Sequence, residues 1–155
     1  MFGKLNSAEI EDLISQQFIG RIGCHADDTT YIVPISYAYD GTYVYGHTFE
    51  GMKINMMRKN SKVCFEVDNT KNLANWQSVI CRGTFEELPN GHEKDEAVRK
   101  LEDRVLPILH SETMRLSPLW PFRSADIIKG IIFRIRLTEK TGRFEKSQNE
   151  YFFAT

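Results

Sequence analysis

The sequence contains no uninterrupted apolar run that approaches the roughly 20 residues of a membrane-spanning helix. Its N-terminus lacks the basic and then apolar pattern of a secretory signal. Neither charge sign dominates, because 20 basic and 21 acidic residues give a formal charge of −1, so no overall field attracts nucleic acid or an anionic membrane. We therefore expect a cytoplasmic protein that binds neither nucleic acid nor membrane.

Cysteine is scarce, and Cys24, Cys64 and Cys81 form none of the close pairs that ligate zinc. Each lies in a strand-like run, where a small buried hydrophobic residue is the ordinary interpretation. The four histidines show no His-x-x-x-His spacing. We expect reduced core thiols and no metal site.

Two catalytic signatures are also missing. The chain has neither the Gly-x-Gly-x-x-Gly string of a dinucleotide-binding fold nor the Gly-x-Ser-x-Gly elbow of a serine hydrolase. Repeats, linkers and low-complexity tracts are absent, and 155 residues suffice to bury one hydrophobic core. We expect a single domain over residues 1–155.

The N-terminal segment "NSAEIEDLISQQF" has the pattern of a short amphipathic helix. Asn6 and Glu9 form a capping-box pair. The apolar residues that share one helical face are Ile10, Leu13, Ile14 and Phe18.

A hairpin is predicted next. "GRIGCHA" and "YIVPISYAY" read as strands, and Asp40-Gly41 is a strong turn signal before "TYVYGH". The pattern predicts that the strand containing Pro34 pairs with "TYVYGH". Because proline cannot donate to a ladder, Pro34 marks an edge, a bulge or a contact with another object.

The remaining pattern favours more antiparallel strands with few helices. A short helix ending near Asn60 precedes the strands "KVCFEVD" and "NWQSVICRGTFEEL", the second of which can bend at Gly83. A helix from about residue 91 to 110, a loop over 111–124 and a strand within 127–142 follow. This order predicts an antiparallel barrel or sandwich with peripheral helices.

The stretch "GHTFEGMKINMMRKN" places glycine and Lys53 at a helix start. Unpaired backbone amides and the positive end of the helix dipole at such a start suit a phosphate. A connector helix with a solvated lysine explains the same string. The pieces together favour a phosphate-bearing planar heterocycle such as a flavin mononucleotide.

The order of these motifs resembles the FMN-binding split-barrel superfamily related to pyridoxamine 5′-phosphate oxidase, and most closely its nitroimidazole-resistance-type members. The resemblance is carried by the run from "GRIGCHA" to "KVCFEVD", by "NWQSVICRGTFEEL" and by "IRLTEKTGR". It spans about Leu5 to Phe144. It implies a mainly β fold, a six-stranded antiparallel split barrel, and a homodimer with two FMN molecules in clefts between the subunits.

The resemblance also implies a set of cofactor-binding residues. Gly51, Met52 and Lys53 would hold the phosphate, and Trp76, Gln77 and Ser78 would approach from the other subunit. The other residues implied along the flavin are Val33, Pro34, Ile35, Ser36, Gly46, His47, Thr48 and Trp120.

The function implied is an FMN-dependent oxidoreductase that reduces a small, for example nitroaromatic, substrate with NADH or NADPH as electron donor. His47 would either donate a proton or hydrogen-bond the flavin. The C-terminal "GRFEKSQNEYFFAT" lacks the Arg-x-His-type substrate motif of the oxidases, so oxidation of a vitamin phosphate is not expected. The alternative is a non-catalytic protein that binds, stores or senses flavin or haem.

Overall fold

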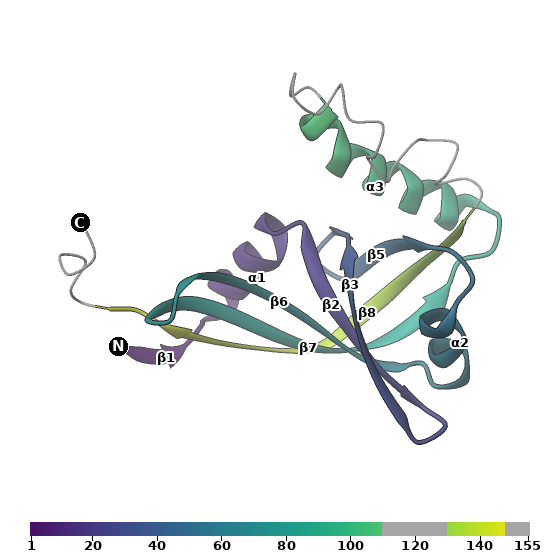
Figure 1. Ribbon diagram of the computed structural model, residues 1–155. Coiled ribbons are helices and arrows are strands. Elements are labelled where there is room, and N and C mark those ends of the chain that lie inside the picture. The colour runs from purple at the N-terminus through teal and green to yellow at the C-terminus, as the bar shows by residue number, and fades with distance from the viewer. Residues whose placement is uncertain (110–129, 148–155) are drawn as a thin grey trace.

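The computed structural model describes residues 1–109 and 130–147. Within these residues one antiparallel sheet of eight strands forms the body of the protein, and three helices flank it (Figure 1). The strands follow the order β3-β2-β6-β7-β8-β5-β4, and β1 pairs with the far end of β8. The predicted mainly β architecture with peripheral helices is confirmed.

Of the eight described strands, six have six residues or more and two are short. The long strands are β2 (Ile19–Ala26), β3 (Thr29–Ser36), β5 (Tyr43–Thr48), β6 (Lys62–Asn72), β7 (Asn75–Glu87) and β8 (Ile131–Glu145). The short strands are β1 (Phe2–Lys4), which was not predicted, and β4 (Ala38–Tyr39). The helices are α1 (Ser7–Gln16), α2 (Met52–Lys59) and α3 (His92–Leu109). The loop predicted over 111–124 lies outside the described residues.

Helix α1 begins with the predicted capping box. The Asn6 side chain accepts from the Glu9 amide at 2.9 Å, and the Glu9 carboxylate accepts from the Asn6 amide at 3.0 Å. The buried residues of the helix are Ile10, Leu13 and Ile14, as predicted. The expectation for Phe18 was wrong, because α1 ends at Gln16 and the Phe18 ring is 45% exposed beneath the Arg104 guanidinium.

Helix α2 packs against β2 through its apolar side. Ile54, Met56 and Met57 are buried in the main core cluster. The helix ends at Asn60, whose amide donates to the Met56 carbonyl at 2.9 Å. The apolar side of α2 therefore determines where its N-terminus lies relative to the sheet.

The pairing predicted for the strand with Pro34 was wrong. Strand β3 pairs with β2, and Pro34 lies opposite Arg21 at the edge of the sheet. The Asp40-Gly41 turn does close a hairpin, but this hairpin consists of the short strand β4 and of β5. The turn at Asp40-Gly41 was therefore predicted correctly. The predicted strand is interrupted between Ser36 and Ala38, however, so its first part, β3, pairs with β2 and not with β5.

The central strands present two faces. Alternate residues such as Phe65, Val67 and Val79 are buried against the helices and form the core face. The opposite side is the outer face, and the register places one row of residues across it: Pro34, Arg21, Glu66, Ile80 and Thr141. The next row contains Ile32, Gly23, Cys64, Arg82 and Glu139.

Strand β7 is irregular at the predicted glycine. The register with β8 shifts between Arg82 and Gly83, which leaves one extra residue on β8. A Cβ on Gly83 would lie 2.5 Å from Ile135 Cγ2 and 2.8 Å from the Arg136 carbonyl oxygen. Glycine is therefore required by the close approach of β8 at this bend.

The β6–β7 hairpin extends beyond α1 and forms, with the ends of β8 and β1, an arm far from α2 (Figure 1). We use "arm" for the segment 69–77 and its paired residues on β8. Leu73 at the tip is 95% exposed.

Two further expectations concern cysteines and membrane spans. Cys24 and Cys81 are buried free thiols, as predicted, but Cys64 lies half-buried on the outer face and is not a core residue. Among the described helices, none is long and apolar enough to cross a membrane.

Candidate functional site

The start of α2 is open, and no described side chain caps it. Gly51 is the N-cap residue, and its carbonyl accepts the first helical bond from the Asn55 amide at 3.1 Å. A Cβ built on Gly51 would meet no atom within 4 Å. The first-turn amides and the positive end of the helix dipole therefore border accessible space.

Lys53 lies in this first turn and is half-buried. Burial lowers the pKa of its ammonium, an effect that the neighbouring Cys24 thiol partly offsets. No residue in the described part of the chain forms a hydrogen bond or ion pair with it. Lys53 is therefore not the solvated lysine of the alternative interpretation, and an anion beside it would relieve an uncompensated charge.

The loop before α2 is held by Arg58 from the last turn of the same helix. Its guanidinium donates to both Glu50 carboxylate oxygens at 2.8 and 2.9 Å and to both Glu87 oxygens at 2.8 Å. Hydrogen bonds from Arg58 lower the pKa of both carboxyl groups, so all three groups are charged at neutral pH. Arg58 thus joins the loop that precedes Gly51 to the end of β7.

The predicted residues of β5 have packing roles that the sequence did not reveal. A Cβ on Gly46 would lie 2.4 Å from Phe133 Cζ, so this glycine makes room for a buried ring. The His47 ring stacks edge-on against Phe49, and its Nε2 is buried against Gly130, where a Cβ would lie only 2.0 Å away. Thr48 ends the strand just before the loop to α2.

The predicted residues of β3 divide between the two sides of the strand. Ile35 is buried in the core, and Val33 packs against it as a half-buried residue. Pro34 and Ser36 lie on the outer face, opposite Arg21 and Ile19. β3 and β5 are not paired in the sheet, but the two strands are in contact.

Trp76, Gln77 and Ser78 belong to the arm end of β7. Trp76 and Ser78 lie on the outer face, where Trp76 Nε1 donates to Glu145 at 3.1 Å and Ser78 Oγ donates to Glu66 at 3.3 Å. Gln77 lies on the opposite face, across from Asn69. Trp120 lies outside the described residues.

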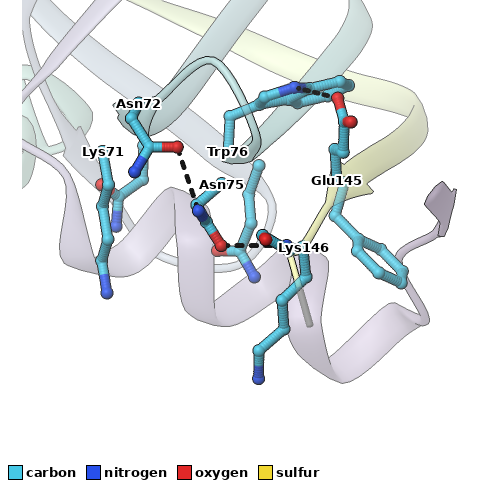
Figure 2. Close-up of a pocket in the computed structure, with 10 residues that line it drawn as sticks. Lys71, Asn72, Asn75, Trp76, Glu145 and Lys146 are labelled. Atoms are coloured by element: carbon cyan, nitrogen blue, oxygen red, sulfur yellow. Dashed lines mark hydrogen bonds between the residues drawn. The ribbon is translucent and has the colours of Figure 1, made fainter. Parts of the chain in front are cut away.

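A cavity of about 440 Å³ lies against the arm. Figure 2 shows its carboxamide-rich wall, in which Asn75 Nδ2 donates to Asn72 at 2.9 Å and Asn75 Oδ1 accepts from the Ser147 amide at 3.1 Å. Lys71 and Lys146 extend at its rim. These bonds fix the tip of the hairpin to the end of β8.

The two groups of predicted residues are far apart within one chain. Lys53 interacts with Cys24 on β2. The next residue, Gly23, lies in the row of the outer face that contains Arg82, so Lys53 lies at the level of Arg82 along β7. Trp76 is six residues along β7 from Arg82, which corresponds to about 20 Å. One chain alone therefore does not bring the arm residues to the start of α2.

The sequence analysis missed a second concave surface. A groove of about 900 Å³ runs over the outer face, and its lining is mostly apolar. Ile32 and Ile80 in it are 66% and 51% exposed. The signal was present in the sequence, because these isoleucines occupy strand positions that alternate with buried residues and would ordinarily be polar. Among the described residues, no cluster of His, Cys, Asp or Glu is suited to hold a metal ion.

The family model for pyridoxamine 5′-phosphate oxidase matches residues 6–144. An uncharacterized protein of Rhizobium meliloti (strain 1021), RA0666, is 31% identical over 143 residues, which cover 90% of this chain and 92% of that protein.

Solved structures with this fold include a FAD-binding protein from Mesorhizobium loti. It is 28% identical, with a TM-score of 0.70, and the match covers 94% of this chain and 99% of that protein. A candidate 5-nitroimidazole antibiotic resistance protein from Bacteroides thetaiotaomicron VPI-5482 shares the fold at 19% identity and a TM-score of 0.70, over 93% of this chain and 87% of that one. The sheet is therefore of the split-barrel type.

Because the Lys53 ammonium is half-buried, we predict that the ligand-free protein becomes more stable when Lys53 is replaced by an uncharged residue. Because the folded-state pKa lies below the usual lysine value of 10.5, the folded state is penalised while Lys53 is charged, and the penalty fades as pH rises toward that value. Lys53→Met should unfold at a higher temperature than wild type at neutral pH, and the difference should shrink near pH ~10. Thermal unfolding followed by circular dichroism measures both.

The control is Lys59→Met on the same helix, since Lys59 is exposed and paired with Asp27. This control should show no gain. A Lys53→Met protein that unfolds at or below the wild-type temperature would contradict the inferred charge penalty.

Proposed function

We propose that this chain, which belongs to the pyridoxamine 5′-phosphate oxidase family, binds FMN as a homodimer and reduces a small, for example nitroaromatic, substrate. The observation that carries the proposal is Lys53, a half-buried cation without a partner among the described residues, beside an uncapped helix start. The M. loti relative is a FAD-binding protein, which supports a flavin in general. The single lysine and the short helix start suit one terminal phosphate, which supports FMN as the flavin proposed here.

The residues present fit the phosphate end of such a cofactor. The open space beside Gly51 admits a phosphate to the first-turn amides, and the Lys53 ammonium supplies the opposite charge. Binding of the phosphate costs less desolvation because the Lys53 ammonium is already partly desolvated before the ligand arrives. Met52, 59% exposed next to this position, is available to cover the ligand.

The remaining residues of the chain would orient the ring. The bound flavin supplies the electron transfer, with NADH or NADPH as donor. His47 is held by Phe49 and Gly130, with Nε2 buried, which favours a positioning contact with the flavin over proton donation through that nitrogen. Pro34 and Ser36 offer backbone groups along β3, which pairs with β2 alone among the described strands.

Two observations support the proposed homodimer, the separation of the two residue groups within one chain and the exposed isoleucines of the outer face. A two-fold axis near the middle of this face would place the arm of one copy over the α2 end of the other. Ile32 and Ile80 would then be buried between the copies, and the arm residues of one copy would reach the α2 end of the other. Trp76 and Ser78 lie on this same face.

The charges of the outer face suit such a rotation. Lys62 and Arg82 lie toward the α2 end, where Glu139 pairs with Arg82 at 3.7 Å and leaves the charge of Lys62 uncompensated among the described residues, whereas Glu66 and Asp68 lie toward the arm. Arg21 pairs with both carboxylates at 3.2 and 2.9 Å and compensates only one of them. A two-fold rotation brings the basic end of each copy to the acidic end of the other, so the face is complementary to itself.

The phosphate role of Lys53 is tested by comparing two flavins. Lys53→Met should weaken FMN binding by at least about tenfold, because a charge-assisted bond is lost, and should leave riboflavin, which has no phosphate, nearly unchanged. Fluorescence titration of the flavin-free protein measures both affinities. Equal losses for the two flavins would remove the phosphate role, and failure of the wild type to bind FMN, FAD or riboflavin would end the proposal.

Reductase activity is tested separately from binding. Flavin-loaded protein mixed anaerobically with NADH or NADPH should lose its absorbance near 450 nm, and a nitroaromatic compound should restore it. Stopped-flow absorbance measures both steps, and free FMN at the same concentration is the control. Absence of bleaching with both donors would favour flavin storage or sensing.

The shared cleft is tested with mixed dimers. Lys53→Met and Trp76→Leu chains should each lose FMN, but co-expressed chains should recover about a quarter of the wild-type FMN content, because half of the dimers carry one intact site of two. Absorbance per chain after purification measures the recovery. Co-expression of Lys53→Met with the Lys53→Met/Trp76→Leu double variant is the matched control, and recovery there or none in the first mixture would contradict the shared site.

A further inference from the structure

Arg58 stands out because it binds two carboxylates from different parts of the chain. Its guanidinium forms two bonds to Glu50, in the loop before α2, and two to Glu87, at the end of β7. Such paired bonds set the plane of both carboxylates. Since Glu87 belongs to the sheet, Arg58 ties Glu50 to a rigid element and not only to its own helix.

Glu50 poses an electrostatic problem for the proposed site. It is the residue before the N-cap Gly51, so its backbone lies within about 7 Å of the first-turn amides. A mobile carboxylate at this place would compete with a phosphate for those amides and repel its charge, because the distance is within the screening length of about 8 Å at physiological salt. Glu50 is 65% exposed and would be free to turn toward the helix start without Arg58.

We propose that Arg58 is a positioning residue that holds the Glu50 carboxylate away from the anion site at the start of α2 and keeps that site selective for a phosphate-bearing ligand. The inference rests on the proposed function, since it concerns the same phosphate. The two cations of α2 would then have different roles. Lys53 contacts the phosphate, and Arg58 holds the competing Glu50 carboxylate away from it.

The inference predicts a ligand-specific loss in Arg58→Gln. FMN affinity should fall roughly tenfold, because Glu50 becomes free to occupy or shield the helix start, while riboflavin affinity should stay within about twofold. Removing the carboxylate as well, in Glu50→Gln/Arg58→Gln, should restore most of the FMN affinity. Arg58→Lys, which keeps the charge but not the fork, should give an intermediate loss. Fluorescence titration with FMN and riboflavin measures all four proteins.

The matched control is Arg134→Gln. Arg134 also bridges two carboxylates, Glu86 at 2.9 Å and Glu93 at 3.2 Å, but these bonds join α3 to the sheet and do not involve Glu50 or α2. It should leave the ratio of FMN to riboflavin affinity unchanged. Thermal unfolding of each variant shows whether a loss of binding reflects a loss of folding.

The outcomes separate this inference from the proposed function. A wild type that binds FMN, together with an Arg58→Gln variant that loses FMN and riboflavin equally or loses neither, would overturn the role of Arg58 and leave flavin binding in place. A double variant as weak as Arg58→Gln would overturn the competition by Glu50. A wild type that prefers riboflavin to FMN would remove the phosphate site itself.

Discussion

The burial of the apolar side of α2 is the constraint on which the candidate site depends. Ile54, Met56 and Met57 pack into the core, so the short helix has only one way to lie against β2. Lys53, one residue before Ile54, is thereby carried into half-buried surroundings, and its pKa falls because of that burial. Burial of these apolar side chains thus offsets the cost of partly desolvating the Lys53 ammonium beside an exposed helix start.

The sheet serves two purposes because its faces differ. The core face closes over α1 and α2, while the outer face keeps exposed isoleucines and charges of both signs. The bend at Gly83, with its extra residue on β8, lies on the side of the core opposite the arm, and it lets β7 keep its pairing with β8 up to Glu87, which binds Arg58. The residues predicted to meet the flavin are split between the α2 end and the arm, and in the proposed homodimer a second copy would bring them together.

Local signals in the sequence were sufficient for much of this fold. The capping box of α1, the strands β6 and β7 and the stop of α2 near Asn60 depend on neighbouring residues only, and all were predicted. The partner of the Pro34 strand was not, because pairing is decided by contacts distant in the chain. The bonds of Arg58 to Glu50 and Glu87 span 8 and 29 residues, and no periodic pattern marks them. The same holds for the half-burial of Lys53, since a helix start reads alike whether its lysine is solvated or enclosed.

Pro34 on the edge strand has a consequence for how copies of this protein meet. β3 pairs only with β2 among the described strands, and an open edge is a template on which a foreign strand can grow a continuous sheet. The ring of Pro34 removes one amide donor from that edge, so a hydrogen-bonded ladder between molecules would be interrupted there. Pro34 therefore disfavours the addition of strands from other molecules to β3, but it does not prevent copies from associating through side-chain contacts.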